Sequence, residues 1–145
     1  MNHIKKFTID ANVFVSFLLE SEENHIHSRK FMEFIFESGV IFPIPMIIIF
    51  EVFQSLRKHG YFEEEGNYIK FNRIFDSDAF KYIDVDEKLF EFFRKFNFFW
   101  SLKTSDAIIA TSALATNSTL ISWDKRLVKA SHNGYTPAEF LKEFS

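Results

Sequence analysis

Four acidic residues stand where the chain could use them for chemistry: Asp10, Glu51, Asp106 and Asp124. Asp10 and Asp124 follow short apolar segments. Asp106 lies at the start of a helical segment, and the apolar segment before Asp124 comes next along the chain. Carboxylates that converge without partners repel each other and raise their own pKa values, and a divalent cation relieves that repulsion. Because an all-oxygen ligand set selects hard ions, convergence of these acids would create a Mg²⁺ or Mn²⁺ site able to activate water against a phosphate.

Each of these acids also has an ordinary structural explanation. Asp10 and Asp124 could be turn residues, and Asp106 could complement the dipole at the start of its helix. Glu51 would usually be a solvated side chain in mid-helix, although isoleucines one turn earlier make its surroundings partly apolar. The prediction of a metal site therefore depends on whether the fold brings the four carboxylates together.

The segments that must position the acids alternate between strands and helices. Strands are predicted at 4–9, 40–42, 80–85 and 119–122, and helices at 13–19, 21–38, 46–58, 61–75, 87–97, 105–116 and 137–143. This alternation predicts an α/β domain with a mainly parallel sheet. In such sheets ligands bind beyond the carboxyl ends of the strands, which is where Asp10 and Asp124 are expected.

Local sequence patterns mark several helix ends. Pro45 suits the first turn of the helix at 46–58, and Thr104 is the expected N-cap of a later helix. Thr136 and Glu139 have the spacing of a capping box, in which each side chain accepts the backbone N–H of the other residue.

Length and composition describe one globular domain over residues 1–145. Apolar residues make up 47% of the chain and cysteine is absent, which excludes disulfides and thiolate metal sites. No segment approaches the roughly 18 apolar residues of a membrane span, and the N-terminus lacks the apolar region of a signal peptide, so we expect a cytoplasmic protein. The net charge of -3 argues against nucleic-acid binding by charge alone.

The segments around the four acids resemble the motifs of PIN domains in order and spacing. They are Thr8-Ile9-Asp10-Ala11-Asn12-Val13-Phe14, the helix from Pro45 to Leu56, Thr104-Ser105-Asp106-Ala107-Ile108-Ile109-Ala110 and Leu120-Ile121-Ser122-Trp123-Asp124. Each motif is weak alone, but the set spans nearly the whole chain. The resemblance implies a three-layer PIN-like domain with a central, mainly parallel sheet of four or five strands flanked by helices.

This resemblance also implies an activity, namely Mg²⁺- or Mn²⁺-dependent hydrolysis of RNA phosphodiesters that leaves 3′-hydroxyl and 5′-phosphate ends. Asp10, Asp106 and Asp124 would hold the principal ion, and Glu51 would hold or orient a second ion or the attacking water. In its length and in the form of its motifs, the chain is similar to the VapC-type toxins of toxin–antitoxin pairs. That similarity implies a homodimer restrained by a small antitoxin protein.

Two further sets of polar residues lie beside the motifs. Three residues could hydrogen-bond the carboxylates or metal-bound water: Asn12, Thr104 and Ser122. For Thr104, a role as a helix cap is the simpler explanation. Three basic side chains could contact the phosphates of RNA: Lys103, Lys125 and Arg126. Solvated surface charge is the simpler explanation of all three.

The aromatic residues raise two questions about surfaces. Trp123 departs from the family pattern, in which smaller residues usually precede the fourth acid, and its ring could pack in the core or stack on a base. The segment from Phe92 to Trp100 is the densest aromatic stretch. Not every ring in it can face inward, so we predict that part of it lines a dimer or antitoxin groove.

Three other functions fit parts of the pattern. A haloacid-dehalogenase-like phosphatase also has an aspartate after its first strand, but it needs a second aspartate where this chain has Asn12. A receiver domain would place its phospho-acceptor near Asp84 or Asp86 and would leave Glu51 and Asp124 unexplained. A non-catalytic module for binding RNA or protein would not need all four acids.

Overall fold

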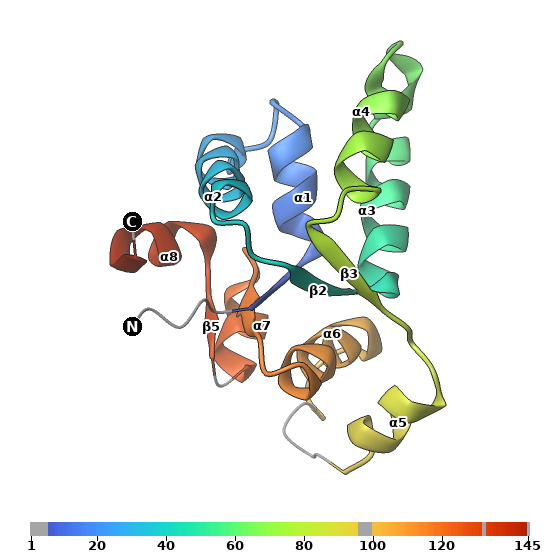
Figure 1. Ribbon diagram of the computed structural model, residues 1–145, viewed down its shortest axis with the longest axis vertical. Helices are drawn as coiled ribbons and strands as arrows, with labels where there is room; N and C mark the ends of the chain where they lie inside the picture. Colours follow the sequence, from blue (N-terminus) through green and yellow to red (C-terminus); the bar gives the residue numbers. More distant parts are fainter. Residues whose placement is uncertain (1–5, 96–99, 132, 145) are drawn as a thin grey trace.

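The computed structural model describes residues 6–95, 100–131 and 133–144 of the chain. Within these ranges five short strands alternate with helices, and every strand pairing is parallel. Figure 1 shows three layers, with α1, α2 and α4 on one side of the strands and α5 and α6 on the other. The α/β class and the layered architecture expected from the sequence are therefore confirmed.

The strands form two hydrogen-bonded groups. The first group contains β1 (Phe7–Ile9), β4 (Thr119–Ile121) and β5 (Gly134–Tyr135), in the order β1-β4-β5. The second contains β2 (Phe42–Pro45) and β3 (Phe80–Ile83). The expected four or five strands are thus present, divided into three and two.

Proline explains why β2 does not join the ladder of β1. The backbone N–H of Phe42 donates to the carbonyl oxygen of Ala79 at 2.7 Å, so this N–H points toward β3. Alternate N–H groups of a strand point to opposite edges, and the positions facing the other edge are Pro43 and Pro45, which have no N–H. The hydroxyl of Thr8 in β1 instead donates to the carbonyl oxygen of Pro43 at 3.1 Å.

The helices within the described ranges surround these strands. Their bounds are α1 (Ala11–Leu18), α2 (His25–Glu37), α3 (Met46–Lys58), a 3₁₀ helix (Tyr61–Glu63), α4 (Asn67–Phe75), α5 (Glu87–Phe93), α6 (Thr104–Ala115), α7 (Lys125–Ala130) and α8 (Pro137–Phe144). None of the helices in the described part is long and apolar enough to span a bilayer.

Phenylalanine rings hold the layers together. Phe14 of α1 is fully buried, and its ring meets those of Phe75 and Phe80 edge-on, with centroid distances of 5.1 and 5.7 Å. Edge-on aromatic pairs add about 0.5–1.5 kcal/mol to the free energy gained from burial. Because α1 is anchored in this way, the residue immediately before it, Asp10, has a fixed place at the end of β1.

Several predicted boundaries are confirmed. The helix predicted at 46–58 is α3, with the same first and last residues. At the start of α8 the N–H of Thr136 donates to Glu139 at 3.0 Å, and the N–H of Glu139 donates to the hydroxyl of Thr136 at 3.1 Å. The predicted capping box is therefore present.

Other predicted boundaries were wrong. The helix predicted from 21 begins at His25, because residues 19–24 form turns. The second strand covers Phe42–Pro45 and not 40–42, so both prolines lie inside it. The helical segment predicted at 61–75 is divided near Gly66, whose φ of +91° is left-handed. Neither β5 nor α7 was predicted.

Candidate active site

The pairing of β1 with β4 brings the first and fourth acids to the same sheet edge. Ile9 lies opposite Ile121, and the N–H of Asp10 donates to the carbonyl oxygen of Ile121 at 2.9 Å. Asp124 follows three positions after that partner. These two strands are therefore neighbours, and both acids lie at the carboxyl ends of parallel strands.

Asp10 is a buried carboxylate with a donor on each oxygen. It is 5% exposed and occupies the N-cap position of α1, where Oδ1 accepts the N–H of Ala11 at 2.8 Å. Oδ2 accepts the hydroxyl of Ser122 at 2.6 Å. Burial raises the pKa of Asp10, these two hydrogen bonds lower it, and the charges of Asp106 and Asp124 raise it.

Ser122 connects the polar groups of this edge. Besides donating to Asp10, its hydroxyl accepts the side-chain amide of Asn12 at 3.1 Å and the N–H of Asp124 at 3.0 Å. The carbonyl oxygen of the Asn12 side chain accepts the N–H of Trp123 at 3.0 Å. Asn12 and Ser122 therefore lie beside the acids in the positions that the sequence predicts for supporting residues.

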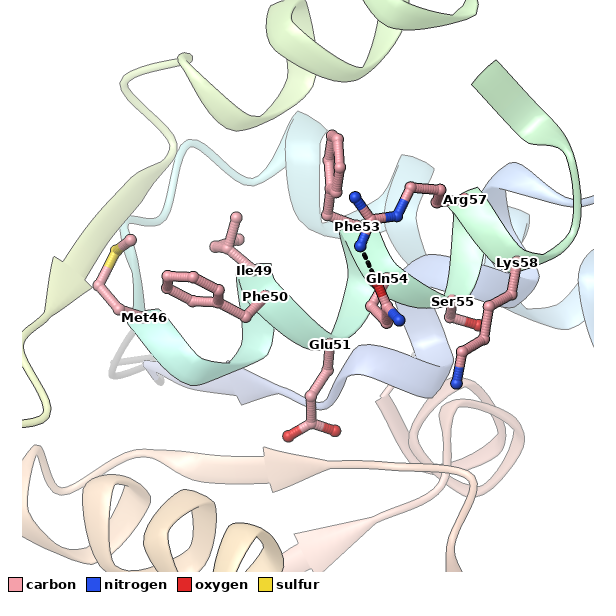
Figure 2. A pocket seen from close by; sticks show the side chains of 9 residues that line it. All are labelled: Met46, Ile49, Phe50, Glu51, Phe53, Gln54, Ser55, Arg57 and Lys58. Atoms are coloured by element: carbon pink, nitrogen blue, oxygen red, sulfur yellow. Dashed lines mark hydrogen bonds between the residues drawn. The ribbon is translucent and has the colours of Figure 1, made fainter. Parts of the chain in front are cut away.

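Glu51 brings a fourth carboxylate from α3. In Figure 2 this carboxylate points away from the side of α3 that carries Phe53. Its Oε1 is buried and has no hydrogen-bond partner among the described residues. Burial and the charges of Asp10 and Asp106 together raise the pKa of Glu51 to about 7, against the lowering effect of Lys103.

Asp106 and Asp124 complete the cluster. Asp106 lies in the first turn of α6, and its pKa is raised by burial and by Asp124 and lowered by Lys103 and Arg126. Asp124 is the N-cap of α7, and its Oδ1 accepts the N–H of Arg126 at 3.0 Å and of Leu127 at 3.3 Å. All four acids thus belong to one electrostatically coupled group.

The chemistry of this group suits a divalent cation. In the described parts of the chain, no three Asp, Glu or His side chains are already arranged as ligands of one ion. The donors are nevertheless all oxygens, which hard cations prefer. A cation would also satisfy the buried, unpartnered Oε1 of Glu51 and relieve the repulsion that raises the pKa values. The four acids are the residues that could hold such an ion.

The predicted cations lie on the exposed rim of the cluster. The Nζ of Lys103 lies 4.0 Å from Oδ2 of Asp106. Arg126 donates to the backbone carbonyl of Ser101 at 2.9 Å, and Lys125 is exposed beside it. These side chains offset part of the negative charge at the site.

Thr104 has a different place from the one predicted. Lys103 occupies the N-cap position of α6, and Thr104 is the first helical residue, so its prediction as a cap was wrong. No hydrogen bond joins Thr104 to the acids within the described chain. It instead lines an apolar hollow of about 200 Å³ with Leu89, Phe90 and Ile108.

Trp123 packs partly into the protein beside the site. Its indole Nε1 donates to the hydroxyl of Ser28 at 2.7 Å, and its ring meets the ring of His27 edge-on. The ring is half-buried and lies against the core. The sequence offered no pattern linking Ser28 to this position, since 95 residues separate it from Trp123.

Only part of the aromatic stretch that was predicted as an interface lies within the described residues. The stretch begins inside α5, where Phe90, two positions before it, is 55% exposed, and Trp100 at its end is 85% exposed. Residues 96–99 lie outside the described residues. The expectation of an interface here stays a prediction.

Comparison with known proteins places the chain in a family. It matches the PIN domain over residues 7–133. Three similar solved structures are a toxin–antitoxin complex from Klebsiella pneumoniae (19% identity, 91% of this chain and 97% of that chain, TM-score 0.65), VapBC2 from Rickettsia felis bound to a DNA fragment from its promoter (14%, 90% and 97%, 0.60) and PAE2754 from Pyrobaculum aerophilum (14%, 96% and 88%, 0.63). At these identities the likeness shows the fold, and no curated protein matches. The family match covers well over half of the sequence, so the chain belongs to the PIN-domain family.

Proposed function

We propose that the protein is a Mg²⁺- or Mn²⁺-dependent endoribonuclease and the toxin of a toxin–antitoxin pair. PIN domains are generally nucleases, and this chain carries the acids that such chemistry needs. The observation that supports the proposal is the placement of the four acids: paired β1 and β4 bring Asp10 and Asp124 to one sheet edge, Asp106 lies in the first turn of α6, and Glu51 of α3 has a buried oxygen without a partner in the described chain. A non-catalytic module would not need this cluster, since the mutual repulsion of the acids is costly without a cation.

Each side chain of the site has a separate role in the proposed hydrolysis. A divalent cation, when bound, lowers the pKa of water and neutralises charge that develops on the phosphate. Asp10, Asp106 and Asp124 would hold the principal ion, and the hydrogen bond from Ser122 would keep Asp10 oriented toward it. Glu51, whose Oε1 is buried and has no partner among the described residues, would hold a second ion or orient the attacking water.

RNA is the substrate that we propose. The phosphate backbone would meet an acidic cluster, so exposed cations beside it are needed in addition to the metal ion. Lys103, Lys125 and Arg126 are the cations on this rim, and we assign them to phosphate contacts. We place this activity in the cytoplasm, where the RNA of a cell is available.

A protein partner is the second part of the proposal. Two of the similar structures are a toxin–antitoxin complex and VapBC2, which supports a small antitoxin as a partner of this chain. The apolar hollow lined by Leu89 and Phe90, together with exposed Trp100, supplies surface for a second copy of the chain. We propose a homodimer that the antitoxin restrains.

One experiment separates the candidate functions. Purified protein is incubated with single-stranded RNA and Mn²⁺ or Mg²⁺, with and without EDTA, and the product ends are identified by mass spectrometry. The proposal expects internal cleavage only with the metal, leaving 5′-phosphate and 3′-hydroxyl ends. Hydrolysis of a small phosphomonoester without RNA cleavage would instead favour the phosphatase alternative, and inertness toward both substrates would favour a binding module.

A further inference from the structure

A hollow of about 350 Å³ opens directly beside the carboxylate cluster. Its wall includes Glu51 of the cluster and the residues next to the first and fourth acids, Ala11 and Trp123. We call it the Trp123 pocket. The residues that give it chemical character are Asn12, Glu22, Asn24, Glu51, Ser55 and Trp123.

The indole ring forms a fixed wall of the Trp123 pocket. Its only donor, Nε1–H, is bound to the hydroxyl of Ser28 at 2.7 Å, and that hydroxyl shares a hydrogen bond of 2.6 Å with Ser16. The ring is therefore held by Ser28 and has no donor left for a ligand. What it offers to the pocket is aromatic surface, on which a nucleobase can stack.

The polar lining of the pocket suits N–H donors and opposes phosphate. Glu22 and Glu51 both line it, whereas none of the lining residues in the described structure is Lys or Arg. Within the described chain Glu22 makes no side-chain hydrogen bond or ion pair. Asn24 occupies the N-cap position of α2 but makes no capping hydrogen bond with its side chain. A carboxylate and an amide are thus available to a ligand.

The pocket is large enough for a flat ring system. Its volume is about 350 Å³. A nucleobase stacked on an aromatic ring has its polar edge free for carboxylate and amide groups. An acidic, aromatic pocket next to a phosphodiester-cleaving cluster therefore matches a base and not a phosphate.

We propose that the Trp123 pocket binds the base of an unpaired nucleotide next to the cleaved phosphodiester, and that it selects guanine. This inference rests on the proposed nuclease function. Guanine presents two adjacent donors, N1–H and N2–H, which one carboxylate can accept together, whereas uracil has one N–H and cytosine and adenine have one amino group each. Glu22 is the acceptor for this edge, Asn24 is an additional polar contact, and Trp123 is the stacking surface.

The cleavage test uses matched RNAs and matched variants. Single-stranded RNAs of uridine with one central G, A, C or U are cleaved with Mg²⁺ by the wild type, by Glu22→Gln and by Glu23→Gln. Glu23 is exposed, adjacent and outside the pocket lining, so its variant controls for the change in charge. We expect preferred cleavage beside G, and a loss of about tenfold in kcat/KM for that RNA in Glu22→Gln only, in the range of a bidentate base contact.

Two results of this test would overturn the inference while leaving the nuclease intact. One is cleavage by the wild type at equal rates on the four RNAs. The other is an unchanged preference in Glu22→Gln.

A second test does not depend on cleavage. The chain has two tryptophans, so Trp100→Phe leaves Trp123 as the only indole. In EDTA, uncharged guanosine should quench its fluorescence more strongly than uridine, and Glu22→Gln should weaken that quenching. Quenching by guanosine in a protein that cleaves no RNA would retain the pocket and refute the nuclease. Quenching by arginine amide but not by guanosine would assign the pocket to a basic segment of a protein partner and overturn the inference.

Discussion

The hydroxyl of Ser122 donates a 2.6 Å hydrogen bond to Oδ2 of Asp10, although 112 positions separate the two residues. The bond joins the segment after β4 to the end of β1, and its acceptor is a buried carboxylate. The same hydroxyl accepts the N–H of Asp124 at 3.0 Å. One small side chain therefore links two of the four acids.

Ser122→Ala is expected to weaken metal-dependent cleavage by about 10- to 100-fold, the usual effect of removing a group that orients a ligand. The lost hydrogen bond lowers the pKa of Asp10 in the wild type, so its removal raises that pKa and lets protons compete with the metal. Cleavage measured against Mn²⁺ concentration at two pH values tests this. Exposed Ser21→Ala is the control, and an unchanged Mn²⁺ dependence in Ser122→Ala would contradict the prediction.

Asp10→Asn is expected to abolish Mn²⁺-dependent RNA cleavage and to preserve the fold. Asparagine caps helices about as well as aspartate, so α1 keeps its N-cap. The free energy of unfolding should change by no more than about 1 kcal/mol. Cleavage assays and urea unfolding measure the two effects, with Asp84→Asn, at an exposed position, as the control. Full activity in Asp10→Asn would remove this residue from the metal site.

Glu51→Gln is expected to change how stability depends on pH in metal-free protein. The pKa of Glu51 is about 7 in the folded protein and near 4.5 when unfolded. Between those values the folded protein binds a proton that the unfolded chain has released, so stability falls as the pH rises. Glu51→Gln cannot lose a proton at this position, so its stability does not fall in this way as the pH rises. After allowance for solvent screening, its free energy of unfolding at pH 8 should exceed that of the wild type by about 1 kcal/mol.

Thermal unfolding in EDTA at pH 5 and pH 8 measures that difference. Exposed Glu65→Gln serves as the control and should follow the wild type. Mg²⁺ at pH 8 should reduce or reverse the advantage of Glu51→Gln, because an ion that binds only the folded wild type stabilises it. Parallel pH profiles of wild type and Glu51→Gln would show that this carboxylate is not the titrating group.

Phe90→Glu is expected to convert a dimer into a monomer. Phe90 is 55% exposed and borders the apolar hollow between α5 and α6, where a charge would be costly to bury against a second copy. Light scattering after size exclusion gives the mass of each species. Ile69→Glu changes an equally apolar, exposed position on α4 and should leave the dimer intact. A monomeric wild type at high concentration would defeat the prediction.

The sequence predicted those features that follow from local patterns. The bounds of α3 follow from its apolar periodicity and from Pro45 before it, and the capping box of α8 follows from the spacing of Thr136 and Glu139. The order of the acidic motifs predicted the cluster, because parallel β1 and β4 bring Asp10 and Asp124 to one edge.

What the sequence did not predict depends on contacts between distant segments. Prolines normally argue against a strand, so β2 was placed too early, and only its position beside β1 explains why Pro43 and Pro45 fit. Glu22 falls near the start of the helix predicted at 21–38. It lines the Trp123 pocket instead, because the chain turns there before α2 begins. No local pattern contains that information.

The division of the strands also has a mechanical consequence. Asp10 and Asp124 follow strands of one hydrogen-bonded group, whereas Glu51 lies on α3, directly after β2 of the other group. No ladder joins the two groups within the described chain, so side-chain packing and the bond between Thr8 and Pro43 hold them together. An ion shared by Glu51 and the aspartates would link the two strand groups directly and restrict their relative motion. Binding of the ion should therefore slow amide hydrogen exchange in α3.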